Sequence, residues 1–255
     1  MSKQIDSTHD DRQVSSGRRE FIKQTAATAG AALASGALLY TGEASAKPAD
    51  EAVTSAQRWG ILVDTSKCAD GCNDCVNACA SENGWGSVEH DPRPKTDAQW
   101  IRSVTIRNKQ TSAEHTLPLM CQHCENPPCA DVCPTGASFR REDGIVLVDK
   151  HICIGCRYCM MACPYKARSF VHETIENQIE YAPRGKGTVE ACTMCVHRVD
   201  DDRNPACVEA CSHQALTFGD LKDPNSDIAK QMKQHATKEL RADLGLNTGV
   251  RYKGL

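Results

Sequence analysis

Aromatic residues are scarce in this chain of 255 residues, which contains three Trp, five Tyr and four Phe. Its mean hydropathy is −0.48, so apolar packing alone offers little stabilisation to a fold of this length. Beyond Tyr40 no stretch approaches the roughly 18 apolar residues that a membrane-spanning helix needs. The net charge is −3 and Lys and Arg are spread along the chain, which gives no support to nucleic-acid binding.

Catalytic motifs are missing too. The sequence has no Gly-rich phosphate loop, no metalloprotease helix motif and no nucleophile elbow. Its nine histidines and its acidic residues form no catalytic set. We therefore expect that the chain is not itself an enzyme and that any chemistry on a substrate takes place elsewhere.

Cysteine, in contrast, is abundant, with sixteen residues in four groups of four. The third group is Cys153, Cys156, Cys159 and Cys163, followed by Pro164, and its spacing C-x2-C-x2-C-x3-C-P is typical of bacterial ferredoxins. Three thiolates on one loop can bind three irons of a cube, while the fourth is displaced toward a neighbouring cube. This spacing predicts [4Fe-4S] clusters and electron transfer.

The other groups vary this spacing, and all four end in C-x3-C. Four ligands for each cube predict four [4Fe-4S] clusters, with no cysteine left over. Metal–ligand bonds would also replace much of the stabilisation that the aromatic residues do not give. The remaining groups are Cys68, Cys72, Cys75 and Cys79; Cys121, Cys124, Cys129 and Cys133; and Cys192, Cys195, Cys207 and Cys211.

Three alternatives remain open. A disulfide scaffold would not produce four groups with matching ends, and such folds are usually shorter. Structural zinc takes two pairs of thiolates and suits best the fourth group, with its C-x2-C-x11-C-x3-C spacing. A small reductase with one substrate-accessible cluster would need an open iron site.

His123 lies inside the second cysteine group and His197 two residues after Cys195. Each either tunes a cluster by hydrogen bonding to sulfur or faces water.

The first 46 residues read as an export signal. Arg18 and Arg19 precede an Ala-rich apolar stretch, and Ala44 and Ala46 supply a small-residue cleavage pattern. This order predicts a twin-arginine signal, which carries folded, cofactor-loaded proteins to the periplasm.

Internal repetition points to two halves. The approach to the first cysteine group, residues 61–68, matches the approach to the third, residues 146–153. Ala137, Ala167 and Ala215 each stand four residues after the last cysteine of a group. We expect an α+β fold of two ferredoxin-like modules with two clusters each. They occupy residues 47–220, in which groups one and four form one half and groups two and three the other, with an insertion at residues 81–116.

Local patterns refine this expectation. Asp143-Gly144 predicts a hairpin between residues 137–141 and 145–148. A strand over residues 100–107 is expected to place Trp100, Val104 and Ile106 on one face and to pair with a return strand near Leu117 and Leu119. Short helices are expected over residues 76–80, 132–134 and 160–164. The tail, residues 221–255, has apolar residues at intervals of four from Ile228 to Leu244, which predicts a helix that packs on its own domain or docks on a partner.

The cysteine groups resemble those of the four-cluster ferredoxin subunits that accompany molybdopterin reductases and NrfD-type membrane proteins. Residues 121–129 and 153–159 match this family most clearly. The resemblance implies that the first group pairs with the fourth and the second with the third. The implied ligand sets are Cys68, Cys72, Cys75 and Cys211; Cys192, Cys195, Cys207 and Cys79; Cys121, Cys124, Cys129 and Cys163; and Cys153, Cys156, Cys159 and Cys133.

Within that family, residues 58–60, the insertion at 69–71 and residues 244–252 are most similar to DsrO-type subunits of DsrMKJOP sulfur-metabolism complexes. This implies a periplasmic subunit that relays single electrons and binds an NrfD-type quinone-reactive membrane subunit and a multihaem cytochrome c. The alternative is the same role in a polysulfide, thiosulfate or nitrite reductase system. The C-x3-C opening departs from the usual C-x2-C, so the group with Cys68 holds either a four-iron or a three-iron cluster.

Overall fold

A computed structural model of the protein describes residues 52–86, 96–176 and 178–255. The expected signal residues Arg18, Arg19, Ala44 and Ala46 lie outside these residues, as does part of the expected insertion, residues 87–95. The described chain contains both helices and strands. None of its helices has the length and apolar character needed to cross a membrane.

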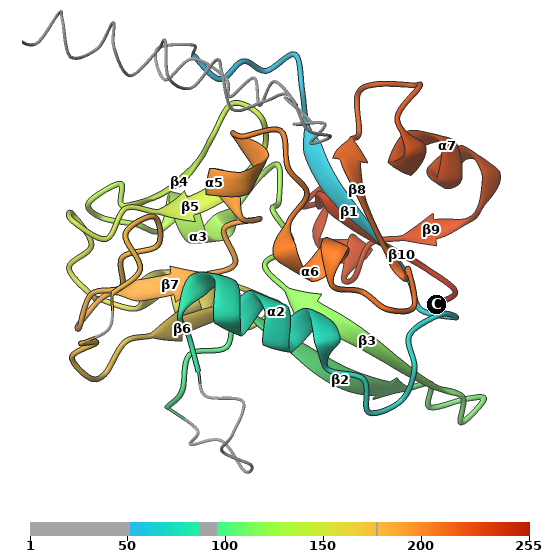
Figure 1. The fold of residues 1–255 in the computed structure, drawn as a ribbon, viewed down its shortest axis with the longest axis horizontal. Helices are drawn as coiled ribbons and strands as arrows, with labels where there is room; N and C mark the ends of the chain where they lie inside the picture. The colour runs from blue at the N-terminus through green and yellow to red at the C-terminus, as the bar shows by residue number, and fades with distance from the viewer. Residues whose placement is uncertain (1–51, 87–95, 177) are drawn as a thin grey trace, which may run out of the picture. The chain divides into compact units, whose positions relative to one another are not determined.

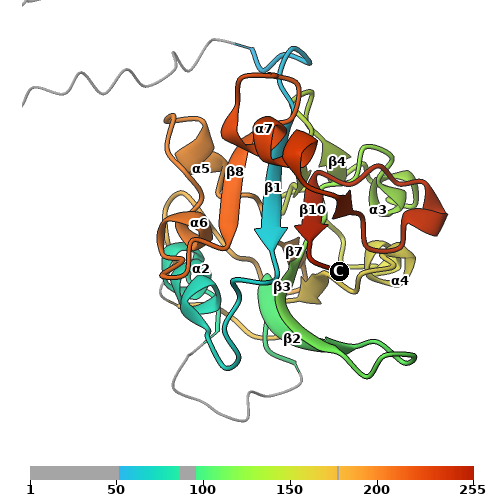
Figure 2. The ribbon, with the colours of Figure 1, turned by 90° about the vertical axis from the view of Figure 1, so that its right-hand side faces the viewer.

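The largest sheet has four strands in the order β8, β1, β10, β9 (Figures 1 and 2). Residues 61–63 in β1 are almost completely buried, as expected for a strand that is covered on both faces. Helix α7 packs on β1 and β8, and its Ile228 is completely buried. The strands are β1 (Trp59–Asp64), β8 (Leu216–Asp220), β9 (Thr237–Lys238) and β10 (Val250–Lys253); β8 is antiparallel to β1, β10 is parallel to β1, and β9 is antiparallel to β10.

Three two-stranded antiparallel sheets complete the strand structure. The predicted hairpin at Asp143-Gly144 is confirmed, because Gly144 takes a positive φ of 91° and β4 pairs with β5. The long strand and its return partner are also confirmed, with Val104 opposite Leu117. The paired strands are β2 (Ile101–Arg107) with β3 (Glu114–Met120), β4 (Ser138–Arg140) with β5 (Val146–Val148), and β6 (Arg168–Phe170) with β7 (Val189–Ala191).

The face predicted for the long strand is only partly correct. Trp100 is buried but precedes β2, and Val104 is half-buried. Ile106 is exposed, because it lies toward the tip of the β2–β3 hairpin, which projects away from the other strands (Figure 2). The buried residue of β2 is Ile101.

The helices are short except for α2. The helix expected over residues 76–80 lies inside α2, and the one expected over 160–164 begins at Tyr158 and ends at Ala162. The helix expected over 132–134 is wrong: α3 starts at Pro128, since proline suits a first helical turn, and ends before Val132. Cys163, which precedes Pro164, has an extended ψ of 112°, as expected for a residue before proline. The helices are α2 (Asp74–Asn83), α3 (Pro128–Asp131), α4 (Tyr158–Ala162), α5 (Val196–Val199), α6 (Ala206–Glu209), α7 (Asp227–Gln234) and the 3₁₀ turn η1 (Ala242–Leu244).

The prediction of a helix from Ile228 to Leu244 is wrong beyond Gln234, where α7 ends. Helix α7 ends there because His235 is extended, with φ −129° and ψ 144°, and the chain enters β9. Hydrogen bonding to β10 replaces the helical pattern at that point. The segment then returns along the second cysteine group, where Gly249 donates to the carbonyl of Gln122 and Glu125 donates to the carbonyl of Leu246.

The alanine repeat has a common structural role. Ala137, Ala167 and Ala215 are all buried, and each is the residue directly before β4, β6 or β8. Each cysteine group also follows a strand: β1, β3, β5 or β7. The cysteines are therefore held on loops and short helices between strands, where the strand ends fix the loops at both sides.

Candidate metal centres

All sixteen cysteines lie in the described residues, and all are free thiols. Their positions follow the repeat: Cys75 and Cys79 lie in α2, Cys129 in α3, Cys159 in α4 and Cys207 in α6. Among residues 52–86, 96–176 and 178–255, no three His, Cys, Asp or Glu side chains are arranged to hold a single metal ion.

The first set of thiols lines a small hollow of about 30 Å³. Burial raises the pKa of Cys68 to about 11 and that of Cys75 to about 12, and the charge of Cys211 contributes to both shifts. The backbone N–H of Ala215 donates to the Sγ of Cys211 at 3.2 Å. Four thiols from distant parts of the sequence thus surround one space: Cys68, Cys72, Cys75 and Cys211.

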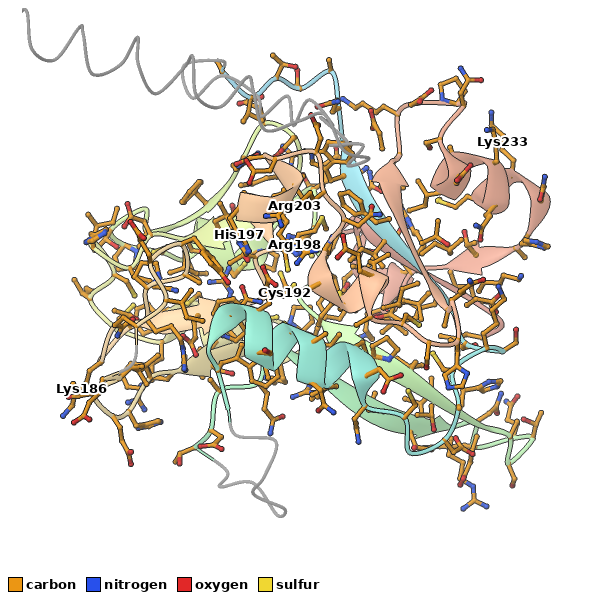
Figure 3. All side chains as sticks on the ribbon, viewed as in Figure 1. Lys186, Cys192, His197, Arg198, Arg203 and Lys233 are labelled. Atoms are coloured by element: carbon orange, nitrogen blue, oxygen red, sulfur yellow. The ribbon has the colours of Figure 1, made fainter. Side chains whose placement is uncertain are left out.

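The second set joins α2 to the fourth cysteine group. Burial raises the pKa of Cys79 well above its usual value, and the charges of Cys192 and Cys195 raise it further. Burial and the charges of Cys79 and Cys195 raise the pKa of Cys207 in the same way. Figure 3 shows Cys192 in the region between α2 and α5. Cys79, Cys192, Cys195 and Cys207 are therefore electrostatic neighbours.

Side-chain and backbone N–H groups donate hydrogen bonds to sulfur atoms of this second set. Trp85 Nε1 donates to Cys79 Sγ at 3.3 Å, and Asn83 Nδ2 donates to the same sulfur at 3.6 Å. The backbone N–H of Met194 donates to Cys192 Sγ at 3.4 Å. Such bonds stabilise thiolates, the form that binds iron.

The third set combines the second cysteine group with Cys163. Burial raises the pKa of Cys124 to about 12, with further contributions from Cys121, Cys129 and Cys163. Burial also raises the pKa of Cys121 to about 12, and the charges of Cys129 and Cys163 add to this shift. Cys163, the last cysteine of the third group, thus interacts electrostatically with thiols of the second group, in agreement with the ligand set that the resemblance implies.

The fourth set that the resemblance implies contains Cys133, Cys153, Cys156 and Cys159. Cys133 is among the thiols whose charge raises the pKa of Cys159, after burial itself. Cys153 and Cys156 lie on the loop before α4, and Cys156 is exposed. The Sγ of Cys133 accepts from the backbone N–H of Ser138 at 3.4 Å.

Electrostatic interactions between thiols link neighbouring sets. Cys75 of the first set acts on Cys207 of the second, and Cys121 of the third set acts on Cys192 of the second. Cys129 of the third set acts on Cys159 of the fourth. These three interactions link the sets in the order first, second, third, fourth.

The two histidines differ. His123 is buried, its Nδ1 accepts from the backbone N–H of Val146 at 3.0 Å, and burial lowers its pKa to about 3. His197 is engaged elsewhere: its Nε2 contacts Glu82 Oε1 at 2.7 Å and its ring stacks on Tyr181. His197 lies near α2 in Figure 3.

Arg168 is a site residue that the cysteine spacing does not reveal. Its Nη2 donates to the Sγ of Cys129 at 3.0 Å, although the side chain is buried. A signal is present in the repeat, because the residue after the repeated alanine is Ser138 or Leu216 in the other groups but a charged Arg168 here.

The chemistry of the donor set fits clusters of iron and sulfur. In each set, burial raises the pKa of at least one thiol and the charges of neighbouring thiols add to the shift, so binding of iron relieves both costs. In the second, third and fourth sets, N–H donors are already directed at sulfur.

Comparison with known proteins agrees with iron–sulfur binding. Residues 113–221, which contain three of the four cysteine groups, match the model of the 4Fe-4S dicluster domain. The Hdr-like menaquinol oxidoreductase iron-sulfur subunit 1 of Archaeoglobus fulgidus is 40% identical over 272 residues, covering 93% of this chain and 98% of its own length. The chain belongs to this family of iron–sulfur subunits.

Other members of the family serve reductases. The tetrathionate reductase subunit of Salmonella typhimurium that matches is 38% identical over 243 residues, covering 94% of this chain and 89% of its own. Protein NrfC of Escherichia coli is 38% identical over 190 residues, covering 74% and 77%. The chain is thus a 4Fe-4S electron-transfer subunit of the type found in such complexes.

Proposed function

We propose that the chain relays single electrons through four [4Fe-4S] clusters held by the four thiol sets described above. The observation that carries this proposal is the series of electrostatic interactions Cys75–Cys207, Cys192–Cys121 and Cys129–Cys159, which link each set to the next. When bound, each cluster takes up and releases one electron, and the chain sets its potential through burial, hydrogen bonds to sulfur and nearby charge.

Both ends of this row reach the surface. The hollow of the first set is open to solvent on one side. At the other end Cys156 is exposed and is flanked by Ile154, 67% exposed, and Met161, 71% exposed. Exposed apolar side chains close in sequence to an exposed thiol suit contact with another redox subunit. Such contact would bury them and shorten the distance over which an electron passes between the subunits.

The partners that we propose are an NrfD-type quinone-reactive membrane subunit and a multihaem cytochrome c, in the periplasm, after twin-arginine export. The DsrO-type role in a DsrMKJOP complex is the finer form of the proposal, and it rests on the sequence resemblance. The menaquinol oxidoreductase subunit among its relatives supports a link to quinones. The likeness to the tetrathionate reductase subunit and to NrfC supports the alternative, the same role in a periplasmic reductase of another substrate.

Iron analysis tests the relay. Anaerobically purified protein is expected to be brown, to bleach on reduction and to contain about sixteen irons per chain. A count near twelve would mean that one set holds no cluster, and a count near fifteen that one set holds a three-iron cluster. If Cys68→Ser leaves such a reduced count unchanged, the incomplete set is the first. Folded, oxygen-free protein without iron would disprove the relay.

Co-purification tests the partners. An affinity-tagged chain isolated from mildly solubilised membranes of its own organism is expected to bring with it a multi-span membrane protein and a haem-staining subunit. A molybdopterin-containing partner without the cytochrome would favour the alternative reductase. Isolation of the chain alone, at native expression level, would contradict both.

A further inference from the structure

Arg168 carries a buried charge without a carboxylate partner in the described chain. Its side chain is 6% exposed, Nη2 donates to Cys129 Sγ, and Nη1 is buried without a hydrogen-bond partner. The groups that act on its charge are thiols, first Cys129 and Cys121, then Cys159 and Cys163. Three of these belong to the third set and Cys159 belongs to the fourth, so the guanidinium lies between two cluster sites.

An isolated buried cation is costly, and proteins tolerate one only beside compensating negative charge. The partly buried Arg184, in contrast, pairs with Glu190 at 2.8 Å. For Arg168 the compensating charge has to come from the thiolates of the two sets and from the clusters that they hold. Its placement thus makes sense only with anionic groups bound on both sides.

His123 supplies a second buried N–H in the same neighbourhood. Because its Nδ1 accepts from Val146, the proton of the neutral ring is on Nε2, and Nε2 is buried without a hydrogen-bond partner. The backbone N–H of His123 also contributes a hydrogen bond to Cys121. The charge of Arg168 acts on the His123 ring, which places the two side chains near one another.

We propose that Arg168 and His123 direct their free N–H groups to the cluster of Cys121, Cys124, Cys129 and Cys163 and raise its reduction potential. Through its charge, Arg168 also raises the potential of the neighbouring cluster of Cys133, Cys153, Cys156 and Cys159. This inference rests on the proposed four-cluster relay. Because the potentials of these two clusters are raised, an electron in the relay would reside mainly on the clusters of the third and fourth sets.

The physical reason is electrostatic. Reduction brings one electron into a cube from a neighbouring reduced cluster and turns one ferric iron into ferrous iron, while no bond breaks and no proton is needed. The cube gains one negative charge, which a buried cation stabilises strongly because the surroundings screen it poorly. Hydrogen bonds to cluster sulfur act in the same direction.

Redox titration of the anaerobically purified full chain, followed by electron paramagnetic resonance, tests the proposal. In Arg168→Met we expect two midpoint potentials to become more negative, while the other two stay within error. Arg168→Lys keeps the charge and is expected to shift them less. His123→Asn is expected to shift one potential only, since asparagine retains an acceptor for Val146 and tolerates the positive φ of 44° at this position.

Arg102→Met is the matched control. Arg102 and Arg168 line one surface pocket, which is separate from the hollow of the first set. Arg102 is only partly buried, and it donates to the carbonyl of Tyr165. Its loss is expected to leave all four potentials within error. If Arg168→Met does not assemble, Arg168→Lys and His123→Asn decide the question.

The iron count separates this inference from the relay itself. A wild-type chain that is folded but holds no iron would overturn the proposed function. Full iron content with unchanged potentials in Arg168→Met, or in both Arg168→Lys and His123→Asn, would overturn the role of Arg168 and leave the relay standing.

Discussion

Sulfur in this protein is surrounded by N–H groups from three different sources. Backbone amides serve Cys211 and Cys192, the Trp85 indole and the Asn83 amide serve Cys79, and a guanidinium serves Cys129. Each kind of donor stabilises negative charge on sulfur to a different extent. We therefore expect the four clusters to differ in potential although their ligands are chemically the same.

A single substitution can test the crosswise arrangement of the ligands. Cys211→Ser is expected to change the same cluster signal as Cys68→Ser, because both thiols line one hollow. Cys207→Ser is expected to change a different signal, one that it shares with Cys79→Ser. The measurement is electron paramagnetic resonance of the reduced variants; identical spectra for Cys211→Ser and Cys207→Ser would refute the arrangement.

The cysteine spacing predicts which residues form the site, but it cannot predict the residues around them. The exit position of the third group is occupied by Arg168, and only the three-dimensional structure shows that its charge lies between two sets. Trp85 is equally hidden in the sequence, since its Nε1 reaches Cys79 from the loop after α2. Short motifs encode ligands, whereas long-range packing decides which side chains modulate them.

At the level of elements, residues 59–64 hold the largest sheet together. Asp64 at the end of β1 binds Lys253 of β10 at 2.8 Å and accepts from the Ser66 hydroxyl. Burial alone would raise the pKa of Asp64, but the hydrogen bonds of Lys253 and Ser66 lower it below its usual value. This contact thus joins the first and last strands of the sheet in sequence order.

Asp64→Asn is expected to lower the free energy of unfolding at neutral pH by about 1–2 kcal/mol. Because the pKa of Asp64 is depressed in the folded state, its contribution is present above the ordinary pKa near 3.8 and is lost as pH falls through the lower folded value. The difference between wild type and variant should therefore shrink below about pH 4. Denaturation followed by circular dichroism at several pH values measures it.

The control is Asp243→Asn. Asp243 pairs with Arg241 in the exposed turn η1, so little change is expected at any pH. A difference for Asp64→Asn that stays constant down to pH 3 would contradict the assignment.

Tyr252 of β10 is the next test at this scale. The side chain is completely buried, and its hydroxyl donates to the carbonyl of Pro118 and accepts from Gln122 Nε2. Tyr252→Phe is expected to cost about 1–2 kcal/mol and to speed the loss of visible absorbance in denaturant. Tyr158→Phe, at an exposed position, should behave like wild type. Equal behaviour of both variants would show that the hydroxyl contacts are unimportant.

Sequence patterns predict hairpins better than helices in this chain. The Asp143-Gly144 turn and the β2–β3 pair depend on local turn chemistry and alternation, which the sequence displays directly. The apolar spacing after Ile228 is misleading, because residues 237–238 gain hydrogen bonds from a strand farther along the chain. Competition of this kind cannot be read from the local pattern.

At the scale of the whole molecule, the proposed twin-arginine export would place the relay in the periplasm. The variant with Arg18→Lys and Arg19→Lys is expected to accumulate in the cytoplasm as a precursor, because the twin-arginine machinery reads that pair. Cell fractionation followed by immunoblotting measures this, with the wild-type chain as control. Undiminished export of the variant would refute the signal.

Residues 246–250 complete the second cysteine loop through backbone hydrogen bonds, and Asn247 stands 122 positions after Glu125, its side-chain partner there. A ribosome needs roughly 6–24 s to translate that interval. Cys121 and Cys124 thus emerge from the ribosome well before their loop can close. The backbone hydrogen bonds that close this loop can therefore form only after translation has passed residue 250.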